Sequence, residues 1–276
     1  MNINSKIIWI KIMNNLKDIS KRIRRSIVKM NAKSFASHSG TALSTVDILT
    51  TLYFKIMNID TNNPTLKTRD KFILSKGHGS SALYATLAER GYFSKELLDG
   101  FYVDGGQLPG HLDKDAVPGV EVSSGSLGHG LAIGVGMAIA NKIDKLDNQI
   151  YVMCGDGELN EGSVWEAIMF ASHKSLDNLT MIIDYNKLQG YGKTNEVINL
   201  EPLNEKLKSF NWDVIEIDGH NFEEIEQALC LETNKPKAII AHTIKGKGVS
   251  YMENEFIWHY KSPNKEQLKQ ALEELS

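Results

Sequence analysis

The sequence contains little cysteine and no long hydrophobic run, and each shortage excludes a class of protein. Only Cys154 and Cys230 occur in 276 residues, and their spacing is not that of metal ligands. Neither a disulfide framework nor a cysteine-based metal site is expected, which favours a reducing, cytoplasmic compartment. The apolar N-terminal stretch, residues 1–16, is interrupted by Lys6 and Lys11 and is too short to span a bilayer. It also lacks a small-residue cleavage site, so it does not indicate an export signal.

An excess of positive charge is also absent. The formal net charge is −3, which gives no general attraction to nucleic acid or to a membrane surface, so an anionic ligand must be held by local geometry. The hydrophobic fraction of 42% is typical of a globular chain with a sizeable core. We expect one domain over residues 16–276, after an N-terminal extension at residues 1–15. Met1 and Met13 both stay open as the translation start.

Helical periodicity is clear in the first part of the chain. Apolar residues recur at helical spacing from Leu16 to Met30, and lysines and arginines fill the other face. We interpret those basic residues as a solvated helix face, with phosphate or nucleic-acid binding as the alternative. A second helix is expected over Ser44–Met57, with Ser44 or Thr45 placed to cap its N-terminus.

Aliphatic strands alternate with helices through the rest of the chain, apart from a glycine-rich segment at residues 104–127 that is expected to be a long functional loop. This alternation predicts an α/β fold, a mostly parallel sheet with helices on both faces. The small-residue helix that follows the loop is expected to pack closely on a neighbour. The expected strands are "KFILS", "IYVMC", "LTMIIDY", "WDVIEIDG" and "KAIIAHT", and the expected helices between them include one ending at Gly91, "SVWEAIMFASH" and "FEEIEQALCL".

Two polar residues follow neighbouring strands of the predicted sheet. Asp156 lies in a Gly-Asp-Gly turn directly after "IYVMC", and Asn186 lies directly after "LTMIID". Because ligands bind outside the carboxyl ends of parallel strands, we expect these two side chains to lie together. A carboxylate, an amide oxygen and a backbone carbonyl suit Mg²⁺, and the flanking glycines allow an anion to approach closely. A Gly-Asp-Gly triplet alone is usually a turn, but with the asparagine it predicts a magnesium-bound diphosphate.

The surrounding motifs resemble a known family. Asp156 to Asn186 resembles the thiamine diphosphate signature, and the chain from Leu16 to Pro263 resembles the N-terminal half of transketolase, above all the separate N-terminal subunit of split transketolases. The segments that carry this resemblance are "AKSFASHSGTALSTVDIL", "LSKGHGSSALYATLAERGYF", "LPGHLDKDAVPGVEVSSGSLGHGLAIGVGMAIA", "GDGELNEGSVWEA" and "TIKGKGVSYMEN" with "WHYKSP".

The resemblance implies roles for individual residues in binding thiamine diphosphate and Mg²⁺. Asp156 and Asn186 would bind the metal through their side chains, and Leu188 through its carbonyl. The histidines that match the ketose-binding and proton-transferring positions are His38, His111 and His259. The implied cofactor contacts are Gly155, Asp156, Gly157, Asn186, His78, His259 and the loop Gly125, Ser126 and Leu127 against the aminopyrimidine.

Other residues have weaker assignments. Glu161 and Glu166 match carboxylates at the subunit interface of the family, but glutamates also favour a helix start for electrostatic reasons. His129 stands where many relatives have glutamine, and Ser126 replaces the proline of many full-length relatives. The remaining histidines are interpreted as turn residues: His129, His173, His220 and His242.

The resemblance covers half of a catalytic site. The family glutamate that activates the cofactor and the arginines that bind substrate phosphate belong to a pyrimidine-binding domain, which nothing in this sequence resembles. The implied function is transfer of a two-carbon ketol unit between sugar phosphates in carbohydrate metabolism, such as the pentose phosphate pathway, by an α₂β₂ assembly with a C-terminal partner subunit.

Alternatives stay open on the sequence. They are a dedicated ketol transferase of another sugar or secondary-metabolite pathway, a relative of deoxyxylulose-phosphate synthase, and a non-catalytic cofactor-binding homologue. A nucleotide-binding protein fits poorly, because neither a Walker loop nor a Rossmann glycine motif after a strand is found.

Overall fold

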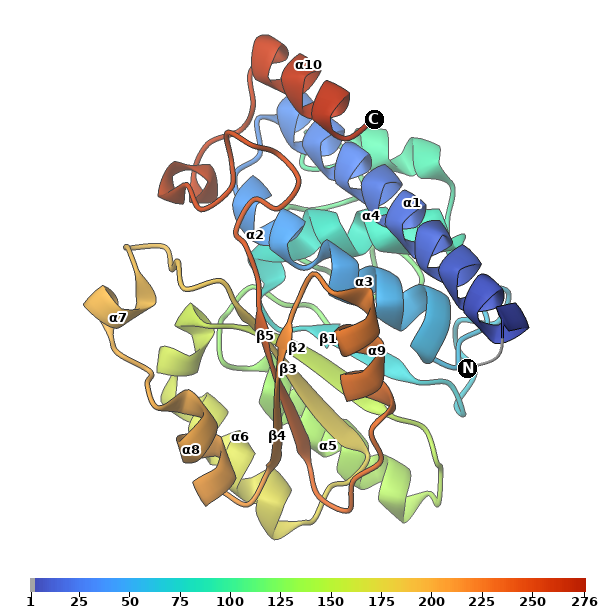
Figure 1. Ribbon diagram of the computed structural model, residues 1–276, viewed down its shortest axis with the longest axis vertical. Helices are drawn as coiled ribbons and strands as arrows, with labels where there is room; N and C mark the ends of the chain where they lie inside the picture. The colour runs from blue at the N-terminus through green and yellow to red at the C-terminus, as the bar shows by residue number, and fades with distance from the viewer. Residues whose placement is uncertain (1–2) are drawn as a thin grey trace.

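A single parallel sheet organises the molecule (Figure 1). The computed structural model describes the backbone of residues 3–276 and the side chains from Asn15 onward. Within these residues the strand order is β1-β2-β3-β5-β4, and each neighbouring pair is parallel. The predicted α/β fold is confirmed. The strands are β1 (Lys71–Leu74), β2 (Ile150–Gly155), β3 (Leu179–Tyr185), β4 (Asp213–Asp218) and β5 (Lys237–His242).

Helices cover both faces of the sheet, because successive side chains of a strand point to opposite faces. Phe72 and Leu74 join the core beneath one helical layer, whereas Ile73 between them joins the core on the other side. The first layer contains α1 (Ile3–Ser34), α3 (Val46–Thr51), α4 (Ser80–Arg90) and α9 (Phe222–Cys230). The second contains α5 (Gly130–Ile143), α6 (Gly162–His173) and α8 (Leu203–Ser209).

Short elements gather where the strands end. The loops after β1, β2 and β5 lead into this region (Figure 1). Helix α2 and the segment that contains η5 also border it. These elements are α2 (Ser39–Ser44), η2 (Gly77–Gly79), η4 (Gly157–Asn160), α7 (Thr194–Val197) and η5 (Phe256–His259), while η1 (Leu52–Ile56), η3 (Lys95–Gly100) and α10 (Lys265–Glu274) lie elsewhere.

The small residues of α5 let it approach the sheet closely, as the sequence predicts. A Cβ on Gly134 would stand nearer to Val152 Cγ2 than real Cβ contacts allow. The long loop is also confirmed, since residues 104–127 form neither a helix nor a strand beyond the bridge at Leu108 in the described structure.

Two expectations for the first helices are only partly confirmed. Helix α3 begins at Val46, so Thr45 stands at the N-cap position as predicted, but neither Ser44 nor Thr45 makes a capping hydrogen bond, because each hydroxyl donates to a carbonyl of the preceding helix α2. The basic side chains of α1 are not all solvated either. Arg24 is buried and makes a two-pronged ion pair with Asp47 of α3. Tertiary packing therefore decides how Arg24 is used.

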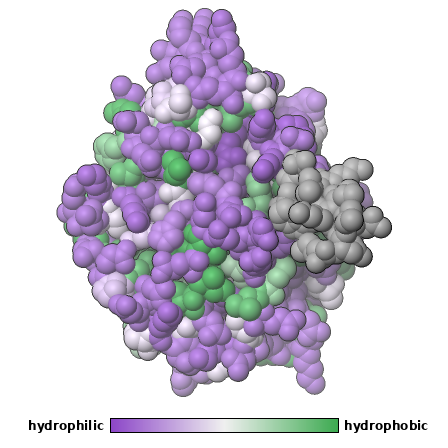
Figure 2. All heavy atoms as spheres, viewed as in Figure 1, coloured by the Kyte–Doolittle hydropathy of each residue, from purple (hydrophilic) through white to green (hydrophobic). Residues whose placement is uncertain are grey.

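The predicted boundary at residue 15 falls inside α1, and side chains before Asn15 lie outside the described residues, so the N-terminal extension stays a prediction. Among the helices that the structure describes, none combines the length and the hydrophobicity needed to cross a bilayer. The face drawn in Figure 2 is mostly hydrophilic, with apolar side chains gathered over the middle of the sheet.

Candidate active site

A cavity of about 540 Å³ lies at the carboxyl edge of the sheet. The loops after β1, β2, β3 and β5 and the segments α2 and η5 all contribute to it, as expected for a ligand site in a parallel α/β fold. The predicted residues that line it are His38, His78, Gly125, Leu127, Gly155, Asp156, Gly157, Glu161, Asn186, Leu188 and His259.

The structure brings Asp156 and Asn186 together. β2 and β3 are neighbours, with Gly155 paired to Asp184 in the ladder. The Asp156 carboxylate accepts a hydrogen bond from the backbone N–H of Lys187 at 2.6 Å, which ties the two strand ends directly. Burial, followed by the nearby Asp184 charge, raises the pKa of Asp156. A cation at this carboxylate would offset both effects.

Oxygen atoms dominate the predicted metal site. It combines one carboxylate, the Asn186 amide oxygen and the Leu188 carbonyl, which accepts a hydrogen bond from Lys245 Nζ at 2.7 Å. Among the residues described, no group of three or more His, Cys, Asp and Glu could hold a metal. Mg²⁺ prefers oxygen ligands. One carboxylate with amide and carbonyl oxygens, completed by ligand phosphates and water, is a set that suits it.

Four histidines predicted from separate motifs meet at this edge. The ring centroid of His38 lies 5.2 Å from that of His78, 5.0 Å from that of His259 and 6.2 Å from that of His111. The backbone N–H of His38 also donates to the His259 carbonyl at 3.0 Å. His111 is exposed at the rim. The rings of His38, His78 and His259 therefore form one wall of the cavity, with His111 close to His38.

The electrostatics of the cavity keep the buried rings neutral. Burial lowers the pKa of His38 to about 4, assisted by His111 and Lys245, and lowers that of His259 to about 3, assisted chiefly by Lys245. Burial also lowers the pKa of His78 well below its ordinary value. Neutral imidazoles can accept protons or hydroxyl hydrogen bonds at neutral pH.

Two buried lysines were missed by sequence reasoning. Lys76 and Lys245 are each 1% exposed and both line the cavity. Lys76 forms an ion pair with Asp184, which also accepts hydrogen bonds from Ser44 and Thr243. Lys76 closely follows β1 and Lys245 closely follows β5. This position after a strand is the sequence feature that could have identified them. Together they supply positive charge where an anion is expected.

Gln189 was also missed. Its side-chain oxygen accepts a hydrogen bond from Asn160, whereas its Nε2 is buried and has no partner among the described residues. A Cβ on Gly157 would approach the Gln189 side chain at 3.1 Å, so the glycine and this side chain are in close contact. An unused donor beside the Gly-Asp-Gly turn fits a diphosphate oxygen.

Other predicted residues lie at the margin. Ser126 lines a neighbouring hollow with His129 rather than the main cavity, and the His129 ring hydrogen-bonds the Leu127 carbonyl. Glu161 and Glu166 are exposed on and before α6, which leaves their proposed interface role open. The interpretation of His220 as a turn residue is incomplete, because its ring contacts Asp47 and accepts from the N–H of Ile244.

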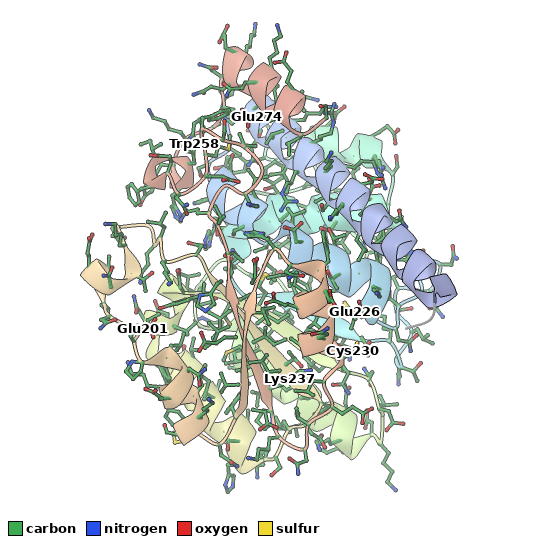
Figure 3. All side chains as sticks on the ribbon, viewed as in Figure 1. Glu201, Glu226, Cys230, Lys237, Trp258 and Glu274 are labelled. Carbon is green, nitrogen blue, oxygen red and sulfur yellow. The ribbon has the colours of Figure 1, made fainter. Side chains whose placement is uncertain are left out.

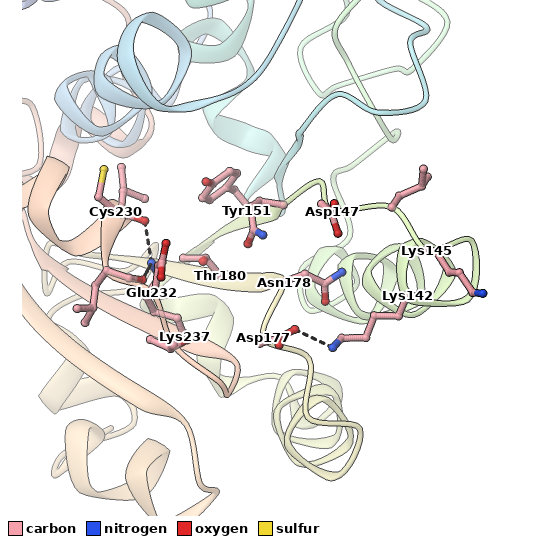
Figure 4. Close-up of a pocket in the computed structure, with 15 residues that line it drawn as sticks. Lys142, Lys145, Asp147, Tyr151, Asp177, Asn178, Thr180, Cys230, Glu232 and Lys237 are labelled. Atoms are coloured by element: carbon pink, nitrogen blue, oxygen red, sulfur yellow. Dashed lines mark hydrogen bonds and ion pairs between the residues drawn. The ribbon is translucent and has the colours of Figure 1, made fainter.

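A second pocket lies at the opposite edge of the sheet. Lys237, at the start of β5, points into carbonyls at the end of α9, and Lys142 pairs with Asp177 (Figures 3 and 4). Burial lowers the pKa of Lys237 to about 8. Its ammonium is satisfied by three carbonyls, so it serves as a helix cap.

Comparison with known proteins agrees with this geometry. Residues 16–275 match the family described as transketolase, thiamine diphosphate binding domain. The chain is 45% identical over 260 residues to one subunit of the apulose-4-phosphate transketolase of Phocaeicola vulgatus, covering 93% of this chain and 92% of that one. It is also 45% identical over 257 residues to one subunit of the 6-deoxy-6-sulfo-D-fructose transketolase of a Clostridium species, covering 92% and 93%.

Solved structures give the same result. The crystal structure of transketolase from Campylobacter jejuni superimposes with a TM-score of 0.89 at 32% identity, over 94% of this chain and 42% of that chain. The chain therefore spans less than half of that enzyme, whereas it spans nearly all of the two separate subunits. These matches cover the residues that build the cavity, and the chain belongs to the transketolase family as its thiamine diphosphate binding domain.

Proposed function

We propose that this chain is the N-terminal subunit of a two-subunit transketolase, which moves a two-carbon ketol unit from a ketose phosphate to an aldose phosphate with thiamine diphosphate and Mg²⁺. The observation that carries the proposal is one cavity in which oxygen ligands, buried lysines and neutral histidines meet. The cofactor supplies the carbon nucleophile and electron sink for cleavage of a C–C bond. Everything else must come from protein side chains.

The residues of the cavity fit a magnesium diphosphate. Asp156, Asn186 and the Leu188 carbonyl would hold the metal, and the unused Gln189 Nε2 would donate to a diphosphate oxygen. Lys245 already hydrogen-bonds the Leu188 carbonyl, so it stands beside the metal position and would face the phosphate charge. With an overall charge of −3, the chain needs this local concentration of donors.

The histidines would handle the sugar. His38, His111 and His259 present polar rings to the space outside the diphosphate edge. The neutral rings of His38 and His259 can accept hydrogen bonds from ketose hydroxyls and so position them for general acid–base catalysis. A polyol substrate uses several such contacts, whereas a substrate without hydroxyls would leave buried rings without partners.

A partner subunit would complete the site. The two relatives that match nearly the whole chain over nearly their own full length are named as subunits. Large apolar side chains are exposed on α5 and α6, with Met169 at 56%, Phe170 at 46% and Ile133 at 37%. A surface of this kind suits a subunit interface close to Glu161 and Glu166. We propose an α₂β₂ assembly in the cytoplasm, inactive as the isolated chain.

A dedicated ketol transferase is the second candidate. The names of the two subunit relatives refer to apulose 4-phosphate and 6-deoxy-6-sulfo-D-fructose, which favours a specialised sugar over the pentose phosphate pathway. Both candidates use the same cofactor site. A non-catalytic homologue would bind cofactor without turning over any ketose.

The first experiment tests cofactor and partner together. The tagged chain is purified gently from its own cells, thiamine diphosphate is detected as thiochrome, and co-purifying proteins are identified by mass. We expect cofactor and a partner with the pyrimidine-binding domain. The complex is then assayed with ketose phosphates, including apulose 4-phosphate, and separately with 6-deoxy-6-sulfo-D-fructose. Ketol transfer by the chain alone would contradict the two-subunit proposal.

A variant tests the metal site. Asp156→Ala should bind thiamine diphosphate at least about tenfold more weakly in the presence of Mg²⁺, since a charged ligand is removed. Intrinsic fluorescence titration of the full chain measures this affinity. Glu232→Gln, an exposed glutamate at the far edge of the sheet, is the matched control and should bind like the wild type. Equal affinities for all three proteins would contradict the assigned metal site.

A further inference from the structure

Glu158 is a buried carboxylate that neither the metal site nor the histidine cluster uses. It is 2% exposed in η4, two residues after Asp156. One of its oxygens accepts from Ser75 Oγ and from the backbone N–H of Gly128 at 2.9 Å, and the other accepts from the N–H of Gly155 at 3.1 Å. None of these donors is charged. A buried carboxylate without a cationic donor costs free energy, so we expect its hydrogen bonds to hold the three donor segments in place.

The three donors come from three segments that meet at the cofactor site. Ser75 follows β1, Gly155 ends β2 inside the Gly-Asp-Gly turn, and Gly128 closes the loop Gly125–Leu127. Ser75 Oγ in turn accepts from the N–H of Gly130 at 3.1 Å, at the start of α5. One carboxylate therefore joins the diphosphate turn to the loop that is expected to contact the aminopyrimidine.

The loop fits tightly on the other side as well. Ser163 Oγ donates to the Gly128 carbonyl at 2.9 Å. Gly128 has φ +82°, and a Cβ there would lie 2.6 Å from Ser163 Oγ and 2.7 Å from Glu161 Cβ. Both backbone polar groups of Gly128 are thus held by side chains that follow the Gly-Asp-Gly turn. The Gly125–Leu127 loop can therefore move only if the hydrogen bonds that Gly128 makes with Glu158 and Ser163 break.

We propose that Glu158 is a positioning residue that sets the distance between the diphosphate turn and the Gly125–Leu127 loop, so that both ends of thiamine diphosphate are held at once. The inference rests on the proposed function. A carboxylate suits the role because each of its two oxygens accepts hydrogen bonds and neither donates. An amide in its place would face one of the N–H groups with its own NH₂, and that segment would shift.

Binding of two different ligands distinguishes a positioning role of Glu158 from a general effect on stability. Thiamine diphosphate spans both segments, whereas inorganic pyrophosphate contacts only the diphosphate turn. With saturating Mg²⁺, Glu158→Gln should weaken thiamine diphosphate binding about tenfold and leave pyrophosphate affinity within about twofold. Calorimetric titration of the chain in complex with its partner measures both dissociation constants.

A second variant approaches the same loop from the opposite side. Ser163→Ala removes the donor to the Gly128 carbonyl, and it should show the same selective loss with a smaller magnitude. It also carries the test if Glu158→Gln fails to fold by circular dichroism. Glu232→Gln is the control and should change neither constant.

Each outcome has a distinct meaning. Selective loss of thiamine diphosphate affinity in the two variants supports the positioning role. Equal weakening of both ligands, or no change in either, would overturn it. A wild-type complex with the partner that binds neither ligand with Mg²⁺ would overturn the proposed function itself and this inference with it.

Discussion

At the scale of single residues, buried charge marks the site. Asp184 is fully buried and accepts from Lys76, Ser44, Thr243 and Asn186. Burial alone would raise its pKa, but the Lys76 charge and these hydrogen bonds lower it. The Asn186 amide N–H₂ is held by Asp184, which leaves the amide oxygen on the side of Leu188. A structural ion pair thereby orients a proposed metal ligand.

Breaking this ion pair should destabilise the fold. Lys76→Met leaves the Asp184 carboxylate buried without its counter-ion, and we expect the free energy of unfolding to fall by ~3–5 kcal/mol. Urea denaturation followed by circular dichroism measures it. The double variant with Asp184→Asn should recover part of the loss, because no uncompensated charge remains and an acceptor oxygen is kept for the neighbouring hydroxyls. A double variant less stable than Lys76→Met would contradict this account.

Protonation of the histidine cluster should destabilise the protein in acid. His38 has a folded pKa of about 4 against an ordinary value of 6.5, so the unfolded chain binds its proton first. Stability from this group is complete above about pH 6.5 and is lost as the pH falls towards about 4. His259 acts in the same direction.

The measurement is the thermal midpoint of the ligand-free chain between pH 8 and pH 5. His38→Asn should give a shallower decline, since asparagine tolerates the left-handed backbone at φ 69° and does not titrate. His173→Asn changes an exposed histidine and should keep the wild-type slope. Identical slopes in the wild type and His38→Asn would count against the assignment.

At the scale of elements, the packing of α5 on β2 depends on one glycine. The Gly134→Ala variant should lose ~1–3 kcal/mol of stability, because the new methyl group overlaps Val152 and pushes the helix outward. On the same helix, a Cβ on Gly136 meets nothing within 4 Å. Gly136→Ala should therefore stabilise by ~0.5–1 kcal/mol. In chemical denaturation, the free energy of unfolding should fall for Gly134→Ala and rise for Gly136→Ala if close packing is the cause.

The elements themselves were largely predictable. β2 and β3 were placed almost to the residue because each is a short aliphatic run bounded by polar turns. The start of the second helix was also close, with Thr45 at the N-cap position of α3, but the side-chain capping was wrong, since serine and threonine read equally well as caps or as residues that donate to the preceding turn. Local sequence does not distinguish these two uses.

At the scale of the whole molecule, apolar surface on α6 points to association. Met169 and Phe170 are exposed next to Glu166 on the same helix. Charged residues there, as in Met169→Glu with Phe170→Glu, should abolish assembly with the partner, because apolar contact area is replaced by desolvated charge. Size-exclusion chromatography with light scattering measures the mass.

The control for assembly is Ile143→Glu, at the exposed end of α5, where the side chain is 74% exposed. It should leave the mass of the complex unchanged. The variants of α6 should keep the thermal midpoint of the isolated chain, since their side chains are exposed. An intact complex in the double variant would place the interface elsewhere.

The sequence by itself determined the alternation of strands and helices, the parallel sheet and the edge at which Asp156 and Asn186 meet, because these follow from local periodicity and strand order. Only the tertiary structure decided that Lys76, Lys245 and Glu158 are buried there. Ser44 and Asp184, for example, are 140 positions apart in the chain. No local pattern reveals such a pairing, because burial of a polar side chain depends on which distant donors the fold brings to it.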